Sequence, residues 1–135
     1  MTKYTRKQQV FDHVARHLIR QGRRSLAPDG VGGRKCVYRT ATGKRCAVGC
    51  LIAKRYYDPV IEGNNVDTEK VKRALRRSGV RITKSIMDLL KDLQVVHDYA
   101  PIESPSRFRQ VVRRQLADLA QVAGVNTKVL GRTTP

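Results

Sequence analysis

Apolar residues recur three and four positions apart in four segments of the sequence, which is the spacing of one face of an α-helix. In residues 5–24 that face carries Val10, Phe11, Val14, Leu18 and Ile19. The second segment covers residues 68–78, the third 83–100 and the fourth 105–123. The spacing therefore predicts four amphipathic helices that bury these faces together.

Residues that begin and end helices support these boundaries. Thr83 precedes the third segment, and Ser104 followed by Pro105 is a favourable pair of N-cap and first helical residue for the fourth. Gly79 and Gly124 follow the second and fourth segments, where glycine commonly terminates a helix. The helix limits are therefore predicted by local chemistry as well as by periodicity.

The remaining segments contain turn residues and short apolar runs. Residues 25–34 hold Pro, Asp and three Gly and predict a loop. Residues 35–49 predict a β-hairpin with Gly43 at its turn, and a short helix should follow and end before Pro59. The predicted fold class is mainly α (α+β), with about four helices and one small β-hairpin. A single domain is expected over residues 1–125, with a frayed tail at 126–135.

Positive charge dominates the composition. Lys and Arg number 28 against 11 Asp and Glu, which gives a formal net charge of +17. Such an excess repels itself in a folded chain, and a polyanion that binds it relieves the repulsion and releases counterions. The alternative is a charged surface that only keeps the protein dissolved. The balance favours nucleic acid, either DNA or RNA, or a host complex that contains it.

The predicted contacts with a nucleic acid or an acidic partner are the cations of the first two helices and of the predicted hairpin. They are Arg16, Arg20, Arg23, Arg24, Arg34, Lys35, Arg39, Lys44, Arg45, Lys72, Arg73, Arg76 and Arg77. Tyr38, Tyr56 and Tyr57 lie within the same basic stretch and are candidates for stacking on exposed bases. Contacts of this kind position a nucleic acid without reading its sequence.

All three cysteines fall within fifteen residues, and three interpretations of them stay open. Cys36, Cys46 and Cys50 could bind zinc if His97 or another histidine supplied a fourth ligand. A thiol could act as a nucleophile if a base lay beside it. The favoured interpretation is structural, because unpaired cysteine behaves as a small buried hydrophobe. In that case Gly49 would allow two backbone segments to approach closely.

His97 lies on or beside the apolar face of the third helix. A histidine in that position is more often a hydrogen-bonded, partly buried residue than a ligand or a base. Asp98 is the next residue and is expected to point elsewhere on a helix, so no ready His–Asp dyad is predicted.

The sequence also resembles a set of small proteins encoded by tailed bacteriophages and prophages. Their pattern is C-x-Y-R, a glycine-containing turn, C-A-x-G-x-L-I and later L-Q-x-x-H-D. This chain matches it at Cys36, Tyr38, Arg39, Gly43, Cys46, Ala47, Gly49, Leu51, Ile52, Leu93, Gln94, His97 and Asp98. The resemblance extends from the first helix to the fourth, and it implies a phage origin but no particular chemistry.

These observations together predict a small basic phage-type accessory protein that acts by occupancy and breaks no bond. It would bind nucleic acid or a nucleic-acid-handling host complex in the cytoplasm of the bacterial host, and so inhibit host machinery or defence in the manner of an anti-CRISPR. The alternatives are a zinc-stabilised protein–protein interaction module and a thiol-dependent enzyme. No cofactor is expected, and zinc is the one alternative for which the sequence offers ligands. The chain has no apolar run long enough to span a membrane, so no membrane partner is expected. The sequence does not indicate an oligomeric state.

Overall fold

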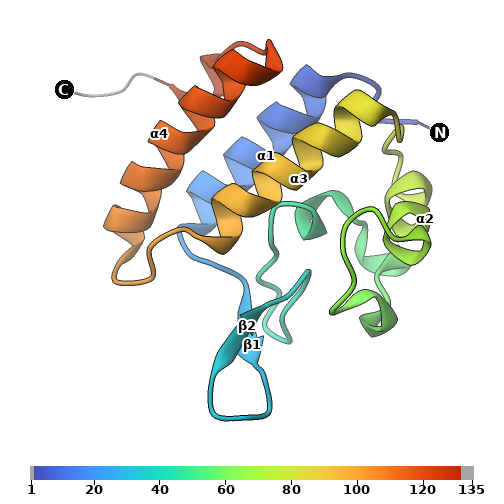
Figure 1. Ribbon diagram of the computed structural model, residues 1–135, viewed down its shortest axis with the longest axis vertical. Helices are drawn as coiled ribbons and strands as arrows, with labels where there is room; N and C mark the ends of the chain where they lie inside the picture. The colour runs from blue at the N-terminus through green and yellow to red at the C-terminus, as the bar shows by residue number, and fades with distance from the viewer. Residues whose placement is uncertain (1, 132–135) are drawn as a thin grey trace.

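The computed structural model describes residues 2–131 and contains four α-helices (Figure 1). They are α1 (Lys7–Gln21), α2 (Glu69–Arg77), α3 (Lys84–Asp98) and α4 (Pro105–Ala123). Strands β1 (Leu26–Pro28) and β2 (Arg34–Cys36) form one antiparallel pair. The predicted mainly α fold with four helices and one small hairpin is therefore confirmed. Within residues 2–131, no helix combines the length and the apolar character that crossing a membrane requires.

Helices α1, α3 and α4 form the main body, and each of the three packs against the other two. Figure 1 shows α2 on the opposite side of α3 from α4. The predicted apolar faces meet at the centre of this body, where Phe11 and Phe108, the two phenylalanines of the sequence, are fully buried. Burying such a side chain contributes about 1.5–3 kcal/mol, so these faces are the main source of stability.

The caps of α3 and α4 are those that the sequence predicts. The Thr83 hydroxyl accepts a hydrogen bond from the Ile86 N–H, and the Ser104 hydroxyl accepts one from the Arg107 N–H. Gly124 ends α4 in the left-handed conformation, with φ of 74°. These bonds pair backbone donors that the first turn of a helix leaves free.

The hairpin lies earlier in the chain than predicted. Strand β1 pairs with β2 from Leu26 opposite Cys36 to Pro28 opposite Arg34, so residues 29–33 are its turn and not a plain loop. The Asp29 carboxylate accepts hydrogen bonds from the N–H groups of Val31 and Gly33 and closes this turn. The predicted hairpin at 35–49 is reduced to a turn about Gly43 with a single antiparallel bridge.

Residues 46–61 form short turns in place of the predicted short helix, buried over residues 46–52 and half-buried or exposed over residues 53–60. Three 3₁₀ turns cover Gly49–Leu51, Lys54–Tyr56 and Pro59–Ile61. A Cβ atom on Gly49 would lie 1.9 Å from the Tyr38 carbonyl oxygen, which confirms the predicted close approach of two backbone segments. Cys46 and Cys50 are both buried here, as the structural interpretation of the cysteines requires.

The predicted frayed tail is wrong for residues 126–131. The Gln8 side chain hydrogen bonds to both the N–H and the carbonyl oxygen of Asn126. Leu130 lies in a 3₁₀ turn (Lys128–Leu130) and is only 4% exposed. An apolar side chain with a place in the core orders the backbone around it. Residues 132–135, also predicted as tail, lie outside the described residues.

Candidate nucleic-acid interface

Four of the predicted cations line one cavity of about 720 Å³, which we call the basic pocket. Arg23 and Arg24 come from the segment that follows α1, Arg34 opens β2, and Lys44 comes from the turn after Gly43. Residues 101–105, which lead from α3 into the first residue of α4, also line the pocket. Figure 1 shows the hairpin projecting from the end of the helical body where this connection lies. Segments that are far apart in sequence thus converge on one site.

Hydrogen bonds hold the walls of the basic pocket in place. The Gln21 side chain donates to the carbonyl oxygen of Arg45 and accepts from its N–H, which ties the end of α1 to the turn. The Ser25 hydroxyl donates to the Lys44 carbonyl oxygen at 3.2 Å. Arg24 donates from Nε to the Ala100 carbonyl oxygen at 2.6 Å, so its side chain is partly committed to the fold.

The charge of the basic pocket is largely uncompensated. Among residues 2–131, no carboxylate lies within ion-pair distance of Arg23, Arg24, Arg34 or Lys44. Glu103 is the one carboxylate in the lining, and four cations outnumber it. Because a cavity wall excludes part of the solvent, the field of these cations is concentrated at its mouth.

The cations of α2 lie apart from this pocket. Lys72 and Arg76 form ion pairs with Glu69, with nitrogen–oxygen distances of 3.4 and 3.3 Å. Arg73 and Arg77 are exposed on the same helix. Since α2 lies on the far side of α3 in Figure 1, the structure places these four residues on a second, partly neutralised surface.

The remaining predicted cations are dispersed around the pocket. Arg16 and Arg20 are exposed on α1, and Lys35 is exposed on β2. Arg45 is half-buried, and so is Arg39, whose Nε is buried without a hydrogen-bond partner among the described residues. The thirteen predicted residues therefore do not form one continuous surface.

The tyrosines predicted to stack on bases are mostly occupied within the fold. Tyr38 is only 8% exposed and its hydroxyl donates to the Asn64 carbonyl oxygen at 2.6 Å, so the prediction that it stacks is wrong. The Tyr57 hydroxyl donates to Glu62 at 2.6 Å. Tyr56 is half-buried, with the Arg55 guanidinium 4.9 Å from its ring centre. These tyrosines are therefore poorly placed to stack on bases.

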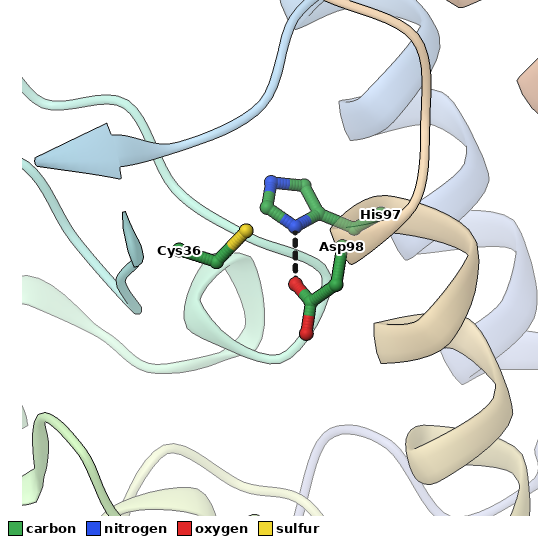
Figure 2. A group of neighbouring side chains, drawn as sticks. All are labelled: Cys36, His97 and Asp98. Atoms are coloured by element: carbon green, nitrogen blue, oxygen red, sulfur yellow. Dashed lines mark hydrogen bonds and ion pairs between the residues drawn. The ribbon is translucent and has the colours of Figure 1, made fainter. Parts of the chain in front are cut away.

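A second group of polar side chains lies where the hairpin meets the end of α3 (Figure 2). Possible ligand atoms of Cys36, His97 and Asp98 all lie within 4.8 Å of one another. His97 Nδ1 is 2.8 Å from Asp98 Oδ1, so the prediction that these neighbours form no pair is wrong. Asp98 is the last residue of α3, and Gln94 also donates to Oδ1, which draws the carboxylate back toward the ring.

The hydrogen bonds of His97 define its tautomer. The Ser25 backbone N–H can only donate, and it lies 2.8 Å from Nε2, so Nε2 carries the lone pair. The proton is therefore on Nδ1 and is donated to Asp98. A metal ion bound to Nδ1 would have to displace that proton while Nε2 still accepted its hydrogen bond. This arrangement therefore does not favour His97 as a metal ligand.

The other two predicted zinc ligands lie outside this group within residues 2–131. The Cys46 sulfur accepts a hydrogen bond from the Gly49 N–H at 3.3 Å, and the Cys50 sulfur donates to the Ala47 carbonyl oxygen at 3.1 Å. These local bonds satisfy both sulfur atoms within their own turn. The structure thus brings together Cys36 and His97 but not the full predicted set of four ligands.

The thiols are held in their neutral form. Burial, reinforced by the Asp98 carboxylate, raises the pKa of Cys36 to about 11. Burial also raises the pKa of Cys46 to about 12 and raises that of Cys50. A nucleophilic cysteine needs a lowered pKa, so none of these environments activates its sulfur.

No family model, curated protein or solved structure matches this chain. Any functional assignment therefore depends on the residues and geometry described above. Sequence reasoning identified the cations of the basic pocket but not residues 101–105, which complete it. No local pattern in that segment of the sequence signals this contact.

Proposed function

We propose that this protein binds nucleic acid by neutralising phosphates at the basic pocket. The observation that supports the proposal is the convergence of Arg23, Arg24, Arg34 and Lys44 on one cavity without carboxylate partners in the described chain. Phosphate oxygens supply the missing negative charge, and counterions released from the nucleic acid drive the binding. Exposed cations such as Arg20 and Lys35 extend the attraction beyond the pocket.

The proposed mode of action is occupancy. Cations are the most numerous charged groups in the described lining of the basic pocket, and they suit the binding of phosphate groups. Bound protein covers a stretch of nucleic acid and excludes other proteins from it. We propose, from the resemblance to phage proteins, that the covered target belongs to a bacterial host and that covering it impairs host machinery or defence.

Binding is tested by fluorescence anisotropy with a labelled oligonucleotide at several salt concentrations. The variant Arg23→Gln/Arg34→Gln removes two pocket cations, and we expect affinity to fall about tenfold and the salt slope to fall by roughly 1.5–2. The matched control is Arg81→Gln/Arg114→Gln, which removes the same charge from two exposed positions outside the pocket.

The two variants separate a site from a diffuse attraction. Equal losses in both would mean that total charge, and not the basic pocket, determines the affinity. Binding that does not weaken as salt rises would contradict phosphate neutralisation altogether. If the protein ignored oligonucleotides but captured one host complex from nuclease-treated lysate, its target would be an acidic protein surface and the nucleic-acid proposal would fail.

A further inference from the structure

The basic pocket is lined by apolar residues as well as by cations. Leu26, Pro101, Ile102 and Pro105 line it together with the four cations. Ile102 is 67% exposed, so its side chain is accessible to a ligand in the pocket. A ligand that fills the pocket therefore meets apolar side chains as well as cations.

The size of the pocket also exceeds what a phosphate group needs. At about 720 Å³, it falls in the range of roughly 300–1,000 Å³ that is typical of sites for organic ligands. A nucleotide combines a flat, weakly polar base with a charged phosphate, and these two parts match the apolar and the cationic residues of the lining. In a duplex the base is stacked and paired inside the helix, whereas in a single strand it is free to turn outward.

We propose that the basic pocket seats one unstacked nucleotide of a single-stranded nucleic acid. The base lies against Leu26 and Ile102, and the adjoining phosphates contact Arg23 and Arg34. This inference rests on the proposed function and specifies its ligand. The nucleotide supplies apolar surface to a side chain that water otherwise surrounds, so single strands bind more tightly than duplexes of the same sequence.

The test compares anisotropy titrations with single-stranded and duplex oligonucleotides of one sequence. The substitution Ile102→Ser removes the apolar contact and leaves every cation in place. We expect it to weaken single-strand binding about fivefold, to leave duplex binding unchanged and to leave the salt slope unchanged. The control Val122→Ser alters another exposed aliphatic residue, 85% exposed on α4 and outside the pocket, and should change neither affinity.

The outcomes distinguish this inference from the proposed function. Equal affinity for both forms and no effect of Ile102→Ser, with weaker binding by Arg23→Gln/Arg34→Gln, would overturn the inference and leave the function standing. Absence of binding to either form would overturn both. A competition arm with a nucleoside monophosphate identifies the source of the nucleotide: if the free compound displaced the strand at equal concentration, the pocket would be a mononucleotide site and the single-strand proposal would fail.

Discussion

His97 shows how a single buried residue positions the basic pocket. It is fully buried, and both of its ring nitrogens are paired, one with the Ser25 N–H and one with Asp98. An unpaired polar group at such a site would cost about 1–3 kcal/mol, so the two bonds are effectively obligatory. Since Ser25 follows Arg24 directly, pairing with His97 fixes the segment that carries two pocket cations.

Cys36 provides a prediction about reactivity. Burial and the Asp98 carboxylate raise the pKa of its thiol from 9.0 to about 11. Because the thiolate is the reacting form, alkylation of Cys36 near neutral pH should be about 100-fold slower than that of a free cysteine. The substitution Asp98→Asn removes the carboxylate charge and should accelerate the reaction.

Iodoacetamide labelling followed by peptide mass spectrometry measures this rate, with the urea-unfolded protein as the unprotected reference. Labelling of native Cys36 as fast as in the unfolded chain would show that the thiol is not suppressed. The thiol-dependent enzyme would then become the stronger interpretation of the cysteine stretch.

The lowered pKa of His17 predicts that the fold loses stability in acid. Desolvation by burial lowers its pKa from 6.5 to about 4, although a hydrogen bond from Nε2 to the Arg45 carbonyl oxygen opposes the shift. Between pH 6.5 and pH 4 the unfolded chain therefore binds a proton that the folded chain does not. The free energy of unfolding should fall as pH falls through this range, by up to about 1.4 kcal/mol per pH unit for one such group.

Urea unfolding at several pH values measures this slope. The substitution His17→Gln removes the titrating ring but keeps a side-chain N–H that can reach the same carbonyl oxygen, so the slope should decrease. Desolvation lowers the pKa of His13 as well, and part of the slope should therefore survive. A slope that is identical in the variant would mean that His17 is not the group responsible.

At the scale of elements, helices were the most predictable part of the chain and pairings between distant segments the least. Helix α4 was predicted at both ends, because Ser104 and Gly124 act on their own neighbours. The predicted position of the hairpin is wrong, because Pro28 and Asp29 are typical of a loop, whereas here Pro28 ends β1 and Asp29 closes the turn of the hairpin.

The residues of the candidate site likewise include some that the sequence predicts and some that it does not. The excess of positive charge led to Arg23 and Arg34 as candidate contacts with an acidic partner. No local pattern indicates that residues 101–105 line the same pocket. The pairing of His97 with Asp98 was also missed, because helical spacing directs consecutive side chains apart and applies less strictly at the last residue of a helix. Long-range contacts of this kind depend on the whole fold, which a single sequence encodes only indirectly.

The segment after α4 provides a prediction at this scale. Leu130 is 4% exposed and belongs to the hydrophobic core, and its 3₁₀ turn contacts α1. The substitution Leu130→Ala should therefore lower the free energy of unfolding by about 2–3 kcal/mol, near the lower end of the range for buried leucines. Val122→Ala, at an exposed position of α4, should change it by less than about 0.5 kcal/mol. Urea denaturation of both variants would contradict this placement if the two losses were equal.

At the scale of the whole molecule, net charge governs how stability responds to salt. The chain carries +17, and within residues 2–131 only four Lys or Arg side chains lie in ion pairs. Repulsion among exposed cations therefore outweighs attraction, and salt screens both. Raising NaCl from about 20 mM to about 300 mM shortens the screening length severalfold, so it should stabilise the fold.

We expect the free energy of unfolding to increase by about 1 kcal/mol between these two salt concentrations. For a domain of this size, that corresponds to a rise in Tm of roughly 3–5 °C. Thermal unfolding followed by circular dichroism measures it. Arg81→Gln/Arg114→Gln lowers the net charge by two without touching the core or the basic pocket, so it should unfold at a higher temperature in low salt and respond less to added salt. A Tm that falls with salt would instead show that ion pairs such as Lys91–Asp67 hold the fold together, and the excess charge would then no longer argue for an external polyanion.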